Sequence, residues 1–207
     1  MPLITGPTLK NVVPTLAPNR AIELADDMDF ILPKYGIDCA DILHEFIANI
    51  AHESGAFRIK CENLNYHTAE RLMKVWPTRF KTKAAAAPYV NQPVKLANLV
   101  YGGRMGNTRP NDGWDMRGGG FAGLTGRDMY QKYAKYWDTD IMKVVDMVRN
   151  DDYWALDSAA WFFAVEKKLI PLAKGDNLVR VVKPWNGGLI GLHDRQYYYD
   201  RAKRYIK

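Results

Sequence analysis

Glycine is distributed very unevenly along this chain of 207 residues. Nine of its 16 glycines lie in the 25 residues from 102 to 126. Glycine adopts backbone conformations that other residues avoid and it weakens regular helices. We therefore expect tight turns and close backbone approach in the middle of the chain, in place of a continuous helix or strand.

The segments on both sides of this loop carry helical patterns. In residues 38–53 apolar side chains recur every three or four positions, which is typical of an amphipathic helix, and Asp38 is the expected N-cap. Residues 1–19 are rich in proline and are expected to be an irregular N-terminal lead-in. Further helices are expected at 69–75, 83–89, 94–100, 126–136, 141–149 and 156–168, and from about 189 to 207. The pattern predicts one mainly α domain with two lobes at most.

Composition restricts the partners and the compartment. The net charge of +6 favours an anionic polymer, either bacterial cell wall or nucleic acid, although plain solubility explains it equally well. Two cysteines, Cys39 and Cys61, make no disulfide framework and suit a reducing cytosol. The N-terminus has no signal-peptide pattern, and no apolar run reaches the roughly 20 residues of a membrane span.

Three kinds of chemistry are disfavoured by the motifs. Serine hydrolase chemistry is not expected, because neither Ser54 nor Ser158 lies in a Gly-x-Ser-x-Gly elbow. The pairs His44-Glu45 and His52-Glu53 do not continue into a zinc-binding His-Glu-x-x-His, so no metal is expected. The glycines at 118–123 match Gly-x-Gly-x-x-Gly without the strand and helix that a dinucleotide site needs, so no cofactor is expected.

Two carboxylates remain as candidates for acid and base chemistry. Glu53 follows Phe46, Asn49 and Ile50 on one helical stripe, so burial is expected to raise its pKa and keep it protonated. Glu62 stands in a polar, turn-like segment where it would stay ionised. Such a pair is what hydrolysis of a glycosidic bond requires. The alternative is structural, with Glu53 as a helix-end partner and Glu62 as a solvated loop residue.

An ordered series of motifs resembles the phage endolysin branch of glycoside hydrolase family 19, the chitinase-like lysozymes. The blocks occur in the family's order over roughly residues 30–205, and each alone is weak. They are Ile50-Ala51-His52-Glu53-Ser54-Gly55-Ala56-Phe57, Glu62-Asn63-Leu64-Asn65-Tyr66, Ala69-Glu70-Arg71-Leu72, Tyr101, Arg104-Met105-Gly106-Asn107, Asp112-Gly113-Trp114, Arg117-Gly118, Gly120, Leu124-Thr125-Gly126-Arg127, Ala160-Trp161-Phe162, Asn186-Gly187-Gly188, Gly191-Leu192 and Asp194-Arg195.

The resemblance implies a lysozyme-like, two-lobed helical fold with a cleft, and residues 20–207 as a single catalytic domain. It implies an inverting reaction with Glu53 as general acid and Glu62 as the base that activates water. Thr125 matches the residue that helps to hold this water. Asn186 matches a sugar-binding asparagine. Arg195 matches the arginine of the last motif, with a salt bridge to Asp194 or Glu53 as the alternative role.

Aromatic side chains are candidates to line the cleft, because their faces suit sugar rings. These are Tyr66, Tyr101, Trp114 and Trp185. For each of them alone, core packing is the competing role.

Three positions depart from the family pattern. Gly119 stands where the family usually has an arginine, Gly123 replaces a glutamine, and Met129 replaces an asparagine. The glutamine and asparagine are polar groups of the family's cleft, so a wider, less polar cleft is expected here. His67 also occupies a place that is commonly serine.

These observations predict a lysozyme-type endolysin that cuts the peptidoglycan backbone, acts as a monomer and binds no nucleic acid. It would wait in the host bacterial cytoplasm, leave through a holin-type pore and act in the periplasm or cell wall. Chitin cleavage is the alternative within the same chemistry. A catalytically weakened wall-binding protein is the alternative outside it, and a nucleic-acid binder comes last.

Overall fold

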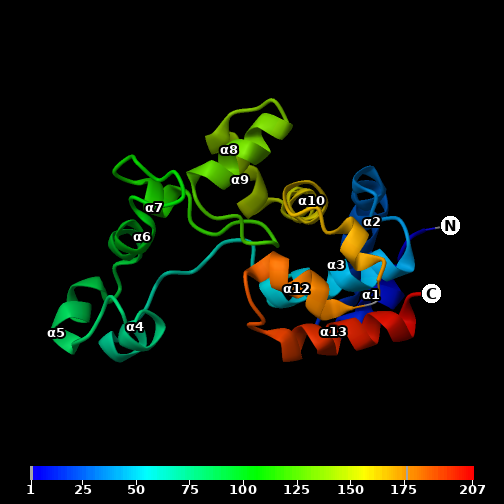
Figure 1. The fold of residues 1–207 in the computed structure, drawn as a ribbon, viewed down its shortest axis with the longest axis horizontal. Helices are drawn as coiled ribbons and strands as arrows, with labels where there is room; N and C mark the ends of the chain where they lie inside the picture. Colours follow the sequence, from blue (N-terminus) through cyan, green and yellow to red (C-terminus); the bar gives the residue numbers. More distant parts are fainter. Residues whose placement is uncertain (1, 176) are drawn as a thin grey trace. The chain divides into compact units, whose positions relative to one another are not determined.

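The computed structural model describes residues 2–175 and 177–207, and within them the chain is helical with no β-strand (Figure 1). This confirms the predicted mainly α fold. The chain divides into two compact units. Unit 1 comprises Met1–Lys60, Gly119–Gly123 and Asp146–Lys207, and unit 2 comprises Cys61–Gly118 and Leu124–Val145.

Unit 1 is built from segments that lie far apart in the sequence, because both the first 60 residues and the last 62 belong to it. None of its helices, nor any other within 2–175 and 177–207, has the length and apolarity to cross a membrane. Its helices are α1 (Gly6–Val12), α2 (Pro18–Ile31), η1 (Leu32–Tyr35), α3 (Ala40–Glu53), the end of α9 (Ile141–Asn150), α10 (Asp152–Trp161), η3 (Phe162–Glu166), α11 (Ile170–Ala173), α12 (Leu178–Asn186) and α13 (Leu192–Tyr205).

Helix α3 is the central helix of unit 1. Every residue from Ile42 to Ala51 is buried, including the polar side chains of His44, Glu45 and Asn49. The helix packs against α11, α12 and α13, and one cluster joins α3, α12 and α13 through Ala48, Leu178, Val182 and Tyr199. Burial of each large apolar side chain contributes roughly 1.5–3 kcal/mol, so α3 is a rigid support for Glu53 at its last position.

The expected lead-in over residues 1–19 needs one correction, because Gly6–Val12 form helix α1. A helix of two turns is too short to show a clear period in sequence, and Thr5 caps it by accepting a hydrogen bond from the backbone N–H of Thr8. Ahead of α1, the backbone N–H groups of Leu3 and Ile4 donate to Oδ1 of Asp29 at 2.6 and 3.1 Å.

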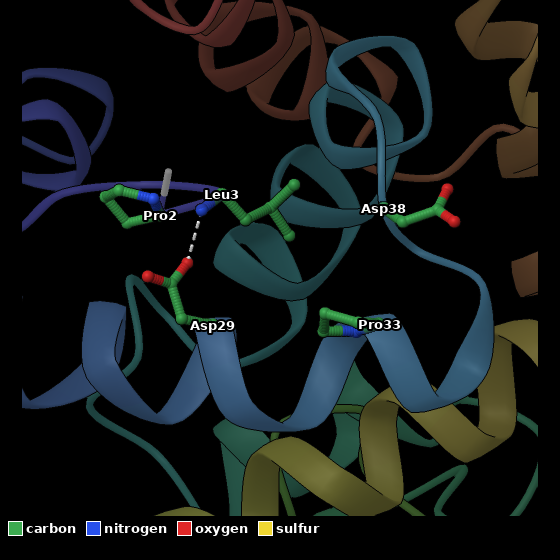
Figure 2. A pocket seen from close by; sticks show the side chains of 5 residues that line it. All are labelled: Pro2, Leu3, Asp29, Pro33 and Asp38. Atoms are coloured by element: carbon green, nitrogen blue, oxygen red, sulfur yellow. Dashed lines mark hydrogen bonds between the residues drawn. The ribbon is translucent and has the colours of Figure 1, made fainter.

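A pocket of about 280 Å³ adjoins this N-terminal segment (Figure 2). None of the residues predicted for the site lines it; its lining consists of Pro2, Leu3, Asp29, Pro33 and Asp38.

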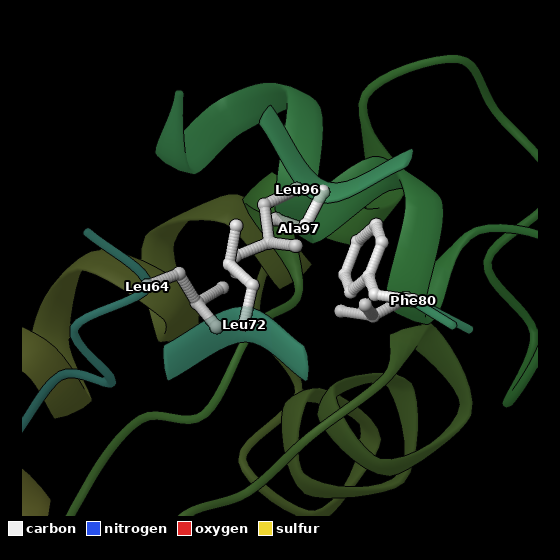
Figure 3. Packing of buried hydrophobic residues seen from close by; sticks show 7 residues of the cluster. Leu64, Leu72, Phe80, Leu96 and Ala97 are labelled. Carbon is white, nitrogen blue, oxygen red and sulfur yellow. The ribbon is translucent and has the colours of Figure 1, made fainter. Parts of the chain in front are cut away.

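Unit 2 has its own apolar core. Leu64, Leu72, Phe80, Leu96 and Ala97 meet in it, together with Ala86 and Val100 (Figure 3). Its helices are α4 (Ala69–Val75), α5 (Lys83–Ala86), η2 (Ala87–Tyr89), α6 (Pro93–Tyr101), α7 (Asp112–Asp115), α8 (Arg127–Tyr136) and the start of α9 (Ile141–Asn150).

The glycine-rich segment contains close backbone approaches, as predicted. A Cβ atom on Gly113 would lie 2.5 Å from the carbonyl oxygen of Ala97, so α6 and α7 touch only because residue 113 has no side chain. Gly106 has φ of 77°, and a Cβ atom there would meet the carboxylate of Asp128 at 2.1 Å. The segment is therefore tightly folded, and all of it except Gly119–Gly123 belongs to unit 2.

Two helix boundaries differ from expectation. Asp38 is not a cap, because α3 begins at Ala40 with Cys39 in the N-cap position and no side-chain cap. The helix expected at 156–168 begins earlier, at Asp152, and continues after Trp161 as the π-helix η3.

Candidate active site

Glu53 ends α3 and is held by two donors from the C-terminal part of unit 1. The indole Nε1–H of Trp185 donates a hydrogen bond to Oε1 of Glu53 at 3.0 Å. The guanidinium of Arg195 donates from Nη2 to the same oxygen. The side chain of Glu53 stays 27% exposed, so a substrate has access to it.

Arg195 lies behind Glu53, with its side chain fully buried. Its Nη1 donates to Oδ1 of Asn49 at 2.7 Å and to the carbonyl oxygen of Asn49 at 3.3 Å. Because a buried cation needs a partner of opposite charge, the carboxylate of Glu53 stabilises it. Of the roles open for Arg195, the structure thus shows the salt bridge to Glu53.

Asp194 has a different partner. Its Oδ2 lies 2.7 Å from Nδ1 of His52, the neighbour of Glu53 on α3. On the other side of this imidazole ring, a Cβ atom on Gly191 would lie only 2.2 Å from Nε2 of His52. The start of α13 is therefore fitted closely against the end of α3.

The turn that follows Glu53 has an unusual backbone. Gly55, Ala56 and Phe57 have φ of 55°, 64° and 61°, so three consecutive residues adopt the left-handed conformation. Each non-glycine residue there costs about 1–2 kcal/mol. Buried Ser54 offsets this cost, since its hydroxyl donates to the carbonyl of Ile50 at 2.6 Å and accepts from the N–H of Phe57 at 2.8 Å.

Glu62 lies in unit 2, in the extended segment before α4. The hydroxyl of Tyr101 donates to its Oε1 at 2.7 Å, and the backbone N–H of Gly118 donates to its Oε2 at 3.2 Å. The backbone N–H of Glu62 in turn donates to the carbonyl of Gly118 at 2.9 Å. The carboxylate is thus anchored to the glycine-rich loop.

The pKa values of two tyrosines near Glu62 are raised. Burial, followed by the negative charge of Glu62, raises the pKa of Tyr101 well above its ordinary value. The same two causes, in the same order, raise the pKa of Tyr66. Both phenols therefore stay protonated at neutral pH, and Tyr101 remains a donor to Glu62.

Thr125 and Glu62 border the same small space beside Gly118. A Cβ atom built on Gly118 would lie 3.4 Å from Oε2 of Glu62 and 3.6 Å from Oγ1 of Thr125. The nearest atom to that Cβ position is Cβ of Glu62 at 3.2 Å, so Glu62 and Thr125 approach the same backbone position of the glycine-rich loop.

The predicted aromatic residues of unit 2 are partly buried. Tyr66, Tyr101 and Trp114 all pack against the core around Leu72, which is the competing role considered for them. Tyr66 also makes an edge contact with Trp76, with ring centroids 5.0 Å apart. On Trp114, the guanidinium of Arg117 covers one ring face at 3.6 Å from the centroid, leaving less of that ring for a sugar.

Asn186 is the last residue of α12 and is exposed. Its Nδ2 donates to the carbonyl of Ile190 at 3.3 Å, across the glycine turn. It follows Trp185 directly, so a ligand bound by Asn186 would be close to the residue that contacts Glu53.

The departures from the family pattern have different surroundings. Gly123 is exposed, has φ of 65°, and no atom lies within 4 Å of the place for its Cβ. Met129 is partly exposed and Gly119 is buried. His67 is exposed, and its Nδ1 lies 2.6 Å from Oδ1 of Asn91.

The structure thus gathers the predicted residues into two groups. Unit 1 holds Glu53, Trp185, Asn186 and Arg195, and unit 2 holds Glu62, Tyr66, Tyr101, Trp114 and Thr125. Sequence reasoning missed the hydrogen bond from Trp185 and the one from the backbone of Gly118. No local signal marks the first, because 132 residues separate Trp185 from Glu53.

Among residues 2–175 and 177–207, no group of three or more His, Cys, Asp or Glu side chains is placed to hold a metal ion.

Comparison with known proteins shows the family through one relative and the fold through solved structures. No family model matches the chain. A protein of Haemophilus influenzae described as a glycosyl hydrolase family 19 domain-containing protein is 34% identical over 152 residues, 72% of each chain. Chitinase C of Streptomyces griseus has a similar fold, with a TM-score of 0.64 at 13% identity over 99% of this chain and 77% of its own. A bacterial family 19 chitinase gives 0.63 at 15% identity over 99% and 95%.

Proposed function

This chain belongs to glycosyl hydrolase family 19 and is a glycoside hydrolase, and on that premise we propose that it is a bacteriophage endolysin that cuts the glycan backbone of bacterial peptidoglycan. The observation that carries the proposal is the contrast between its two carboxylates. Glu53 lies against a buried cation at a rigid helix end, whereas Glu62 accepts a separate hydrogen bond on each oxygen.

The proposed reaction is a single inverting displacement. Glu53 protonates the leaving glycosidic oxygen, and Glu62 removes a proton from a water molecule that attacks the opposite face of the sugar. The space between Glu62 and Thr125 supports this role for the water. Asn186 binds the sugar from unit 1. An inverting pair acts at a separation of roughly 6.5–9.5 Å, so the mechanism requires that spacing when the glycan is bound.

The choice of peptidoglycan is supported by the charge of +6 and by the endolysin-like motif series. The carboxylates of peptidoglycan attract a basic protein, which raises its concentration at the wall. We further propose that the enzyme works as a monomer without cofactor, waits in the host bacterial cytoplasm, and reaches the cell wall through a holin-type pore.

Fragment analysis of purified Gram-negative sacculi tests the proposal. Wild type is expected to release fragments with new reducing ends, identified by mass spectrometry, and Glu53→Gln and Glu62→Gln are expected to release none. Glu70→Gln is the matched control, because Glu70 is exposed and pairs only with Lys83 on the surface. Anhydro ends in place of reducing ends would remove Glu62 from its role as base.

The stereochemistry gives an independent test. Hydrolysis of β-linked chains by an inverting enzyme must first produce the α-anomer at the new reducing end. Proton NMR during the first minutes of the reaction distinguishes the two anomers. Initial formation of the β-anomer would contradict the inverting mechanism while leaving the glycosidase activity in place.

Chitin is the second candidate substrate, favoured by the similar folds of two chitinases. Chitin oligomers offered beside sacculi separate the two, because a chitinase would cleave the oligomers faster. A weakened wall-binding protein is the third candidate, based on Gly119, Gly123 and Met129. It would be supported if Glu53→Gln bound sacculi and wild type released no sugar ends.

A further inference from the structure

Both donors to Glu53 approach the same oxygen. Trp185 Nε1–H and Arg195 Nη2–H both donate to Oε1. Within the described residues of unit 1, no donor is hydrogen-bonded to the other oxygen, Oε2. A carboxylic acid carries its proton on one oxygen only, and an oxygen that already accepts two N–H groups has no room for an O–H hydrogen.

Trp185 is held firmly in its place. Trp185 is only 5% exposed. Its ring makes an edge contact with Phe162 at 5.0 Å and a tilted contact with Phe163 at 6.0 Å between centroids. Such aromatic packing fixes the direction of the indole N–H, so the hydrogen bond to Glu53 does not depend on a mobile side chain.

We propose that Trp185 is a positioning residue which, together with Arg195, locks Oε1 of Glu53 and leaves Oε2 as the oxygen that gives its proton to the substrate. This inference rests on the proposed role of Glu53 as the acid. When the proton leaves Oε2, negative charge spreads over the carboxylate. A hydrogen bond to a charged oxygen is about twice as strong as one to a neutral oxygen, so the indole N–H favours the transfer.

The charged groups around Glu53 within unit 1 are few. Arg195 faces it from α13, and its neighbour His52 on α3 is bound to Asp194 of α13. From α12 the contact is the neutral indole of Trp185. Loss of this donor would therefore destabilise the ionised form of Glu53 without a change in net charge, and the alkaline limit of activity should move to higher pH.

NMR of the indole N–H groups tests the contact without an activity assay. The six tryptophans give six indole signals, and the one that disappears in Trp185→Phe belongs to Trp185. In wild type this signal should shift as the pH is lowered. In Glu53→Gln the shift should be absent, which separates the effect of Glu53 from that of His52. A signal that is insensitive to pH, or equally sensitive in Glu53→Gln, would overturn the inference.

Kinetics of Trp185→Phe complete the test. Phenylalanine keeps the apolar contacts with Phe162 and Phe163 but has no N–H. We expect kcat on the substrate that wild type cleaves to fall roughly tenfold, KM to change little, and the alkaline limb of the pH profile to move upward. Trp137→Phe, at the end of α8 in unit 2, is the control and should leave the profile unchanged.

Two failures can be told apart. If Glu53→Gln remains active, the proposed acid is wrong. If Glu53→Gln is inactive but Trp185→Phe keeps the wild-type pH profile, only the proposed role of Trp185 is wrong. A purely structural contact would lower kcat without moving the alkaline limb of the pH profile.

Discussion

The phenol of Tyr101 donates a hydrogen bond of 2.7 Å to Oε1 of Glu62, and the backbone of Gly118 occupies Oε2. Each oxygen of Glu62 thus has its own donor, whereas both donors to Glu53 share Oε1. Donors on both oxygens favour the ionised carboxylate that a base must be. At Glu53 the Arg195 cation also favours the ionised carboxylate. The difference between the two residues lies in Oε2 of Glu53, which accepts no hydrogen bond from the described residues of unit 1 and can carry a proton.

Replacement of Tyr101 by phenylalanine should weaken the base. Its raised pKa keeps the phenol protonated, so wild type retains this donor at neutral and moderately alkaline pH. A hydrogen bond to a charged group contributes about 1.5–3 kcal/mol, which corresponds to a loss in kcat of roughly tenfold to hundredfold. The acidic limb of the pH–rate profile should also move to higher pH. Tyr197→Phe, on the exposed face of α13, should have no effect on either quantity.

An alanine at Gly118 should exclude the attacking water. Its methyl group would lie 3.4 Å from Oε2 of Glu62 and 3.6 Å from Oγ1 of Thr125, in the space proposed for that water. We expect hydrolysis to fall by at least about tenfold, while the midpoint of thermal unfolding stays within a few degrees of wild type. Full activity in Gly118→Ala would place the water elsewhere.

The stability of the protein should depend on Asp112 at low pH. Hydrogen bonding by the Arg127 side chain lowers the pKa of Asp112 to about 2. Since the unfolded value is about 3.9, this contribution is complete above about pH 5 and is lost progressively as the pH falls through 2 towards 1, a loss of roughly 2 kcal/mol. Urea unfolding between these pH values measures it.

The matched variant for that titration is Asp112→Asn. It leaves the largely buried Arg127 without its charge partner, so it should cost about 3 kcal/mol at neutral pH and remove the dependence on pH. Equal pH dependence in both proteins would assign the effect to another carboxylate.

Two glycines of the same turn should respond differently to alanine. Gly191 has φ of 74° and would press its Cβ against His52, whereas Gly187 has φ of 71° with no atom within 4 Å. Gly187→Ala should cost about 1 kcal/mol for the backbone conformation alone. Gly191→Ala should cost more than about 2 kcal/mol and should reduce activity, because it displaces the residue next to Glu53. Thermal unfolding and hydrolysis of the same substrate compare the two variants. Equal losses of stability and activity would show that the His52 ring moves aside at little cost.

Much of the fold was predictable because several helices follow local rules. Helix α6 covers the expected residues 94–100, and α4 covers residues 69–75 as the period predicted. Some helices were missed: α7 and α11 have only four residues each and show no period, and α12 at Leu178–Asn186 was not expected. The π-helix at Phe162–Glu166 was also beyond local reasoning, because its spacing resembles that of an ordinary helix end.

Residue type and motif order indicate Glu53 and Glu62 as the candidates for acid and base, and these roles stay predictions. The stripe that leads to Glu53 already contained Asn49, which the structure shows as a partner of Arg195. The contacts that hold Glu53 were not predictable, because they join positions more than 130 residues apart. Whether a side chain binds substrate or supports another residue depends on such contacts, as Arg195 illustrates.

The number of residues between Glu53 and Arg195 in the sequence also matters during translation. These residues are 142 positions apart, so at ribosomal speed the acid emerges on the order of ten seconds before its cation. Unit 2 is complete on the ribosome while unit 1 still awaits residues 146–207. A chain released early, anywhere before position 195, contains both glutamates but lacks the ion pair behind Glu53. The arrangement around Glu53 is therefore expected to be complete only when translation has nearly finished.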